Sequence, residues 1–328
     1  MLALLVVVTV AGFAWIQRAL APVDAEGGEA MRLTFEVESG DTIGRVAYEL
    51  EEEGLIRSAR VARWFARAED LSSKIKVGEY ELSPAQSTPE ILAMLAEGRV
   101  NTHPIVIPEG LRAVEIADRL DAAGLADREE FLAIVTDPEV AKSYGIEASS
   151  LEGYLFPDTY RFARGLLAER VVGAMVDEFM EVYLELAPQA ASQDLSMHEL
   201  VTLASIVEKE TGAPQERPLI AAVFLNRLKR RMRLETDPTV IYGIEDFDGN
   251  LRKVHLLDES NPYNTYKISA LPPGPIASPG REALSAVLNP ADASYLYFVS
   301  RNDGTHVFSK SYAEHERAVD QYQRRRGR

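Results

Sequence analysis

The chain has 328 residues, which is room for roughly two domains of about 150 residues each. Hydrophobic residues make up 46% and charged residues 26%, and these ordinary globular shares exclude a mainly disordered, collagenous or multi-span membrane chain. The net charge of −16 argues against nucleic acid as the main partner, because phosphate binding needs surplus Lys and Arg. The absence of cysteine excludes disulfides, thiol nucleophiles and cysteine-ligated metals.

The N-terminal segment is an apolar run. Residues 2–16 carry no charge, and Arg18 and the polar stretch 24–29 follow them. This run is shorter than the ~20 residues of a full span, but residues 19–22 extend it while the Arg18 side chain reaches the headgroups. We therefore expect a membrane anchor over residues 1–22. A cleaved signal peptide and a buried helix are the alternatives, and the lack of a basic start leaves the orientation open.

Residues 31–100 predict a small module. Its expected elements are a strand near 35–38, a helix capped by Asp41 or Thr42, a helix at 58–68, a strand at 77–82 and a helix at 88–97. This strand–helix–helix–strand order resembles a LysM module, a family that binds N-acetylglucosamine polymers; a packing or spacer domain is the alternative. The first strand and helix recur seventy residues later, through either coincidence or duplication.

The segment from residue 129 to about 193 predicts mainly helix, interrupted at 149–162. This interruption is rich in aromatic residues and holds Glu152 and Asp158 beside Gly and Pro, so it predicts a loop. Flat rings and carboxylates suit a sugar cleft, because rings stack on pyranose faces and acids bind hydroxyls. An ordered loop that covers the core is the alternative.

Residues 197–210 predict an amphipathic helix capped by Ser196 or by Asp194 upstream. At about 100° per residue, Glu208 falls on the apolar stripe, whereas Glu210 falls nearly opposite, on the face with Glu199. A core-facing carboxyl is costly unless it is paired or protonated, and burial raises its pKa. Glu208 is therefore a candidate general acid. A buried structural glutamate bonded to Arg or to backbone donors is the alternative.

The C-terminal third combines a second helix with long loops. Apolar residues between 221 and 228 form a stripe that contains Asn226, and the basic run 227–233 is expected on a solvated face. Rigid loops rich in Pro, Tyr and Asn follow, and long ordered loops of this kind tend to carry function. Two strands between 293 and 308 are expected around the turn Asn302-Asp303-Gly304.

Six motifs follow one another along the chain. They are LEGYLFPDTY at 151–160, LASIVEKET at 203–211, FLNRL at 224–228, TDPTVIYG at 236–243, YNTY at 263–266 and LPPGPI at 271–276. In sequence and order they resemble the YceG-like endolytic murein transglycosylases. Several long motifs in a fixed order are far more specific than one short pattern.

The resemblance implies an α+β chain in three parts: the membrane anchor at 1–22, the LysM-like βααβ subdomain at 31–100, and a mainly helical catalytic domain with peripheral strands at 101–328. It implies a single-pass protein of the bacterial inner (cytoplasmic) membrane with its catalytic domain in the periplasm. The implied activity is that of a lyase, which cleaves the MurNAc–GlcNAc bond within nascent peptidoglycan strands, leaves 1,6-anhydroMurNAc ends and terminates glycan elongation. Peptidoglycan synthases are the implied partners.

The essential glutamate of that family falls on Glu208. We expect Glu208 to protonate the glycosidic oxygen and then, as a carboxylate, to take the proton of the muramyl C6 hydroxyl while that oxygen closes onto C1. A second acid across the cleft would instead favour a hydrolase. The candidates for that acid are Glu152, Asp158, Glu235 and Asp237. A non-catalytic peptidoglycan-binding scaffold is an alternative of another class.

Several polar residues in the motifs are candidates for sugar binding, and each is equally a good turn or cap residue. They are Glu152, Asn226, Thr236, Asp237 and Asn264. The five histidines are scattered without ligand spacing. We therefore expect neither a metal nor a cofactor.

Overall fold

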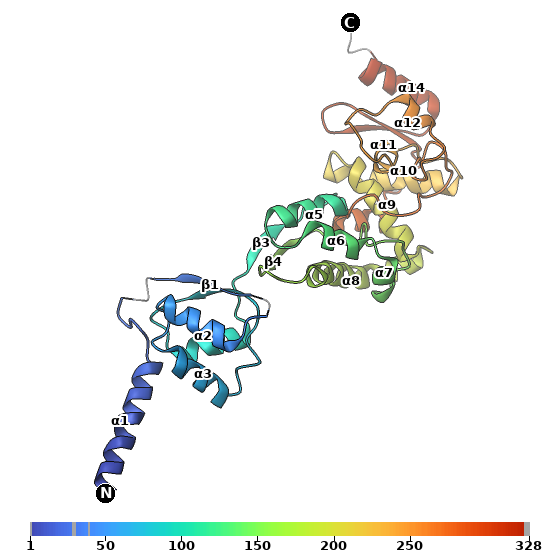
Figure 1. Cartoon of the computed structure of the whole chain (residues 1–328). Helices are drawn as coiled ribbons and strands as arrows, with labels where there is room; N and C mark the ends of the chain where they lie inside the picture. Colours follow the sequence, from blue (N-terminus) through green and yellow to red (C-terminus); the bar gives the residue numbers. More distant parts are fainter. Residues whose placement is uncertain (1, 28–30, 39, 325–328) are drawn as a thin grey trace. The chain divides into compact units, whose positions relative to one another are not determined.

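The computed structural model describes residues 2–27, 31–38 and 40–324, with side chains from residue 10 onward. The chain divides into two compact units, which we describe separately. Unit 1 comprises residues 1–105, 124–126 and 161–167, and unit 2 comprises residues 106–123, 127–160 and 168–328. Helices alternate with small two-stranded sheets (Figure 1), so the expected mixed α and β architecture is confirmed.

Unit 1 begins with a helix, and a two-stranded sheet with three helices follows. Its elements are α1 (Leu2–Leu20), β1 (Leu33–Val37), α2 (Ile43–Glu52), α3 (Ala59–Ala68), β2 (Gly78–Leu82), α4 (Thr88–Glu97) and the start of β3 (His103–Val106). β1 and β2 pair antiparallel with Phe35 opposite Tyr80. Both rings are buried in one apolar core with side chains of α2, α3 and α4. The predicted β-α-α-β order is present, and its likeness to LysM stays a prediction.

The helix starts of unit 1 follow from local chemistry. Thr42, Ser58 and Ser87 precede α2, α3 and α4, and each side-chain oxygen accepts a backbone N–H of the first turn. Such caps satisfy donors that a helix leaves unpaired. The predicted starts of these three helices therefore agree with the structure.

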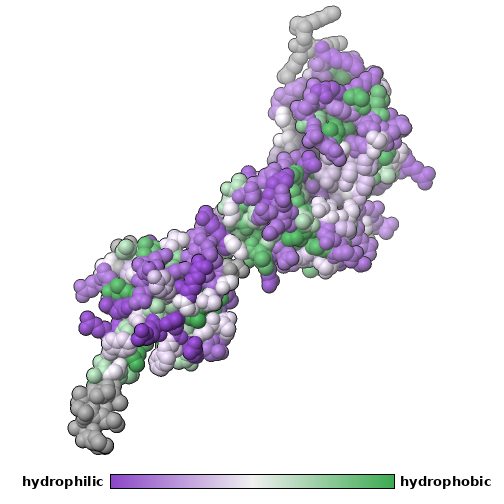
Figure 2. All heavy atoms as spheres, in the orientation of Figure 1, coloured by the Kyte–Doolittle hydropathy of each residue, from purple (hydrophilic) through white to green (hydrophobic). Residues whose placement is uncertain are grey.

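Unit 2 is mainly helical. Its elements are α5 (Ala113–Ala122), α6 (Arg128–Val135), α7 (Pro138–Ser143), β4 (Thr159–Phe162), α8 (Ala168–Ser192), α9 (Met197–Glu210), α10 (Arg217–Lys229), α11 (Asp237–Tyr242), α12 (Lys253–Leu257), α13 (Arg281–Leu288), β5 (Tyr297–Ser300), β6 (His306–Ser309) and α14 (Tyr312–Val319). β3 pairs with β4, and β5 pairs antiparallel with β6 around the predicted turn. The space-filling view shows a surface that is mostly hydrophilic, with small hydrophobic patches (Figure 2).

The predicted membrane anchor coincides with α1. Of the helices that the structure describes, none combines the length and the apolar character needed to cross a membrane. Met1 and the side chains of residues 2–9 lie outside the described part of the chain. The anchor therefore stays a prediction.

The core of unit 1 makes a stability prediction. Leu50 of α2 is fully buried in the cluster around Phe35 and Tyr80, so Leu50→Ala should lower the free energy of unfolding by about 2–5 kcal/mol. Both tryptophans, Trp15 and Trp64, belong to unit 1. Urea unfolding followed by tryptophan fluorescence therefore reports on this unit.

Tyr48→Phe is the matched control on the same helix. The Tyr48 side chain is exposed, so this change should stay within about 0.5 kcal/mol. Equal unfolding midpoints for Leu50→Ala and Tyr48→Phe would contradict the assignment of Leu50 to a packed core.

Candidate active site

Helix α9 is the central element of unit 2. It contacts α8, α10, α11 and α13, and its residues from Leu200 to Val207 are all buried. Ser196 caps it as predicted: its Oγ accepts the backbone N–H of Glu199, and the Glu199 carboxylate accepts the N–H of Ser196. The last turn of a rigid, enclosed helix therefore positions Glu208.

The Glu208 carboxyl is held on both of its oxygens. Its side chain is only 7% exposed. Oε1 accepts a hydrogen bond from Nη2 of Arg217 at 2.9 Å, and Oε2 accepts the backbone N–H of Gly280 at 3.1 Å. Arg217 begins α10, directly after the short turn that follows α9. Charge-assisted bonds of this kind fix the carboxyl in one orientation.

A second carboxyl shares the same guanidinium. Nη2 of Arg217 also donates to Oε2 of Glu109 at 3.1 Å. Burial, followed by the nearby charge of Glu208, raises the pKa of Glu109. A Cβ at Gly280 would overlap Oε1 of Glu109. A larger residue there would therefore displace the Glu109 carboxylate, which is the end of a flexible side chain.

Sequence reasoning missed Glu109 and Arg217. Glu109 lies in the Pro-Glu-Gly turn after the second copy of the repeated strand, a position we noted only for its secondary structure. Arg217 lies 108 residues further along the chain. The Pro-Glu-Gly turn was the available signal for Glu109, but only the fold shows that it reaches α9.

Glu210 lies nearly opposite Glu208 on the helix, and its residue is partly exposed. Its carboxyl accepts a hydrogen bond from Oγ1 of Thr236. Burial raises the pKa of Glu210. Its position on the helix alone did not predict this bond. The candidate Thr236 therefore holds Glu210, while Asp237 accepts a bond from the Tyr266 hydroxyl at 2.8 Å.

Glu152 is a third buried carboxyl. Its Oε1 accepts the backbone N–H of Ala113 at 3.0 Å, and its Oε2 accepts the Tyr242 hydroxyl at 3.3 Å. Burial raises its pKa from 4.5 to about 7. The loop that carries it packs tightly, because Gly153 has φ +86° and a Cβ there would lie 2.3 Å from Pro275. The predicted loop is therefore ordered and buried over residues 151–156. The prediction is wrong at its end, where Thr159–Phe162 form strand β4.

The other two candidates bind backbone. Nδ2 of Asn226 donates to the carbonyls of Ala293 and Tyr295 at 2.8 and 3.0 Å. Nδ2 of Asn264 donates to the carbonyls of His255, Leu256 and Asp258. The structure thus gives both amides partners in the scaffold of unit 2, and neither is bonded to Glu208.

Arg227 corrects a second prediction. The basic run at 227–233 was expected on a solvated face, but Arg227 is 7% exposed. Its guanidinium donates to the carbonyls of Leu296, Arg233 and Leu234 and pairs with Glu235 at 3.0 Å. A buried arginine that binds several carbonyls joins segments of the chain, which a charge run alone does not reveal.

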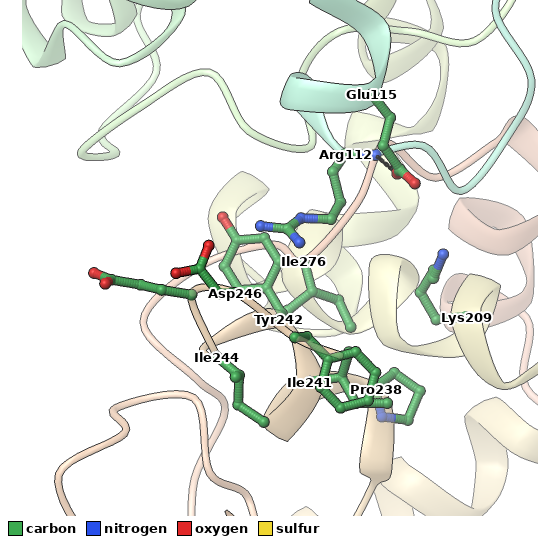
Figure 3. A pocket seen from close by; sticks show the side chains of 11 residues that line it. Arg112, Glu115, Lys209, Pro238, Ile241, Tyr242, Ile244, Asp246 and Ile276 are labelled. Atoms are coloured by element: carbon green, nitrogen blue, oxygen red, sulfur yellow. Dashed lines mark hydrogen bonds between the residues drawn. The ribbon is translucent and has the colours of Figure 1, made fainter. Parts of the chain in front are cut away.

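A cavity of about 610 Å³, which we name the Tyr242 cavity, lies beside the same end of α9 (Figure 3). Lys209, the residue after Glu208, lines it. The Arg112 guanidinium lies over the Tyr242 ring, 4.8 Å from the ring centre. The apolar lining consists of Pro238, Ile241, Ile244, Phe247 and Ile276, and the acidic lining of Glu115, Glu245 and Asp246.

Metal ligands are not grouped in the described ranges 2–27, 31–38 and 40–324: no three His, Asp or Glu side chains there are placed to hold an ion. The arrangement offers acid–base chemistry instead. A fixed carboxyl, a second carboxyl and one shared guanidinium lie beside a cavity with mixed charge. Such a set can hold and move a proton at one oxygen.

The raised pKa of Glu152 predicts a pH-dependent stability. Below pH 4.5 the carboxyl is protonated in both the folded and the unfolded state, and above about 7 it is ionised in both. Between these values the unfolded chain releases the proton that the folded chain keeps, so stability falls as pH rises. Glu152→Gln removes this pH-dependent loss of stability. The difference in free energy of unfolding, variant minus wild type, should therefore increase by roughly 2–3 kcal/mol from pH 4.5 to 7. Urea unfolding at several pH values measures it, and a constant difference would contradict the burial of Glu152 as a neutral acid.

Known proteins resemble this chain over most of its length. The model of the YceG-like family matches residues 35–321. A protein named endolytic murein transglycosylase from Bacillus subtilis (strain 168) is 30% identical over 323 residues, which cover 92% of this chain and 88% of the relative. A protein of the same name from Streptococcus pneumoniae (strain R6) is 29% identical over 345 residues, and the alignment spans 95% of this chain but 62% of that relative.

A solved structure shares the fold. The crystal structure of a YceG-like protein from Listeria monocytogenes superposes with a TM-score of 0.61 at 34% sequence identity, covering 87% of this chain and 98% of that one. The family match covers most of the chain, and the identity to the Listeria protein supports it independently. The chain therefore belongs to the YceG-like family.

Proposed function

We propose that this chain is a peptidoglycan lytic transglycosylase that cuts within glycan strands, with Glu208 as its general acid and then its base. The observation that carries the proposal is the buried Glu208 carboxyl, fixed by Arg217 and Gly280 at the end of α9. The relatives named endolytic murein transglycosylase support the substrate and the type of reaction.

The reaction needs no external water. Glu208 donates its proton to the glycosidic oxygen, and the bond from that oxygen to C1 of the muramyl residue breaks. The N-acetyl group of the substrate stabilises the positive charge at C1. The Glu208 carboxylate then takes the proton of the C6 hydroxyl, and O6 bonds to C1, so one carboxyl serves both steps. The products are a new GlcNAc end and a 1,6-anhydroMurNAc end.

Arg217 controls when Glu208 is available as an acid. A guanidinium bonded to Oε1 competes with a proton for that oxygen. Because Glu109 binds the same Nη2 atom, Arg217 can keep one carboxylate partner while it releases the other. Glu109, whose side chain is 43% exposed, is then the carboxylate that keeps Arg217 while Glu208 holds the proton.

The cellular setting is part of the same proposal. The apolar segment at 1–22 anchors the chain in the bacterial inner membrane, and the catalytic unit works in the periplasm on strands that peptidoglycan synthases are extending. The LysM-like subdomain at 31–100 binds the glycan. Cleavage within a nascent strand then ends its elongation.

Glu208→Gln tests the proposed acid. The amide keeps the size of the side chain and can still accept the Gly280 N–H, but it cannot donate a proton to the glycosidic oxygen, so the rate of cleavage should fall by about 10²–10⁴-fold or more. The assay is mass spectrometry of fragments released from purified glycan strands. Anhydro ends identify the lytic reaction, whereas reducing ends, one water heavier, identify hydrolysis.

The matched control for this change is Glu181→Gln, an exposed position on α8 of the same unit. It should cleave like wild type. Equal activity of Glu208→Gln and wild type would remove Glu208 from the mechanism and leave a non-catalytic scaffold as the better hypothesis.

Glu109→Gln tests the role of the shared arginine. Without the second carboxylate, Arg217 has Glu208 as its remaining acidic partner among the described residues, so the guanidinium competes more strongly with the proton that Glu208 must carry. We expect kcat to fall about 10- to 100-fold with little change in KM. A fall in the unfolding midpoint that accounts for the lost activity would show that Glu109 only supports the fold.

A further inference from the structure

The proposed cleavage leaves the Tyr242 cavity without a role. The Glu208 carboxyl faces Arg217 and Gly280, whereas the cavity is lined by Lys209 and the segment 238–247 (Figure 3). Its volume of about 610 Å³ lies in the range of sites for small ligands and short peptides. A cavity of this size beside the candidate acid suggests a second point of contact with the substrate.

We infer that the Tyr242 cavity binds the peptide carried by the muramyl residue, with a peptide carboxylate on Arg112 and a peptide amine beside Asp246. The inference rests on the proposed function, because it assigns a further part of the same substrate. Three observations support it: the free donors of Arg112, the charge pattern of the lining and the position of the cavity relative to Glu208.

Arg112 has unused hydrogen-bonding capacity. Its guanidinium lies on the Tyr242 ring and feels the charge of buried Glu152. It donates no hydrogen bond to any residue in the described part of the chain, and its Nε is buried without a partner. A guanidinium offers five N–H donors in a planar fork that matches a carboxylate. Tyr242 thus presents this fork to the cavity without occupying its donors.

The charge pattern favours a peptide over a sugar ring. In the view of Figure 3, Lys209 lies on one side of the cavity and Asp246 on the other, with Arg112 and Tyr242 between them. N-acetylated sugars inside a strand are neutral, whereas this lining carries two cations, Arg112 and Lys209, and three acids, Glu115, Glu245 and Asp246. A wall peptide carries carboxylates and one diamino acid, and its alanine methyl groups fit the apolar lining.

The cavity and the acid flank one stretch of backbone. Nζ of Lys209 donates to the carbonyl of Gly110 at 3.0 Å. A Cβ at Gly110 would lie 3.6 Å from Cγ of Glu208 and 3.7 Å from Cδ of Lys209. A muramyl residue that places its glycosidic oxygen at Glu208 therefore has the substituent of its C3 within reach of the cavity.

The first test measures binding without catalysis. Isothermal titration of the full chain in detergent with a free wall pentapeptide, which carries a diamino acid at its third position, should give measurable binding, and Arg112→Gln should weaken it about tenfold. This variant keeps the helix start of α5, because the bond to Glu115 uses the backbone N–H of residue 112. Arg119→Gln, an exposed arginine on the same helix, is the matched control and should bind like wild type.

A second titration tests the acidic side of the cavity. Acetylation of the peptide amine should weaken binding to wild type severalfold and should have no further effect on Asp246→Asn. Absence of binding to wild type, or an equal effect of Arg112→Gln and Arg119→Gln, would overturn the inference.

The second test separates this inference from the proposed function. Glycan strands with intact peptides and the same strands stripped by an amidase are compared as substrates, and Arg112→Gln should lower the ratio of their kcat/KM values about tenfold. If Arg112→Gln lowers kcat/KM by the same factor on both kinds of strand, the peptide site is contradicted and the proposed cleavage reaction is not. If wild type cuts neither strand, the proposed function fails, and the titration alone decides whether the cavity binds peptide.

Discussion

The buried ion pair between Glu208 and Arg217 is the constraint on which the candidate site depends. A charge taken out of water costs several kcal/mol unless it is paired and hydrogen-bonded. Glu208 therefore needs Arg217 and the Gly280 N–H, and Arg217 needs both Glu208 and Glu109. Because the partners come from separate parts of the chain, they form only when α9, α10 and the segments before α5 and α13 have packed together.

Helix α9 provides the rigidity that such a pair requires. Its middle is buried on several sides, and its neighbours fasten onto it through polar bonds as well as packing. Oγ of Ser205 accepts the N–H of Ile276, and His198 joins the Tyr154 hydroxyl to the carbonyl of Pro273. Two of the loops that carry the recognised motifs are thus tied to one helix. The long loops are ordered because α9 gives them hydrogen-bond partners.

Local chemistry made much of this fold predictable. The caps at Ser58, Ser87 and Ser196, the bounds of α9 and the hairpin near Asn302 all follow from short-range patterns of polar and apolar residues. The placement of Glu208 on a core-facing stripe came from the same reasoning, and its side chain is indeed nearly inaccessible.

The failures came from long-range packing. A helical wheel shows which residues share a face but not which side chains of other segments bind them, so the bond between Thr236 and Glu210 was not predicted. A run of basic residues does not show that one of them, Arg227, reaches across to carbonyls near residue 296. Glu109 and Arg217 carry no local signal of their pairing. Predicting these contacts requires the tertiary structure, because the partners are far apart in sequence.

Two carboxyls of unit 2 have distinct surroundings. Glu152 accepts a backbone N–H and a tyrosine hydroxyl, and burial raises its pKa to about 7 while it joins its loop to the start of α5. Glu208 instead pairs with a guanidinium that it shares with Glu109. The two carboxyls therefore differ in what holds them: neutral hydrogen-bond donors hold Glu152, whereas a cation and a backbone N–H hold Glu208.

The shared guanidinium also bears on the choice between lysis and hydrolysis. A glycosidase that uses water needs its two carboxyls on opposite faces of the sugar, with room for a water or a covalent bond between them. Glu109 and Glu208 converge on the same nitrogen of Arg217, so the cation that pairs with one acid also pairs with the other. An attack by the C6 hydroxyl of the substrate itself needs only one acid, which is why the proposed mechanism assigns both proton transfers to Glu208.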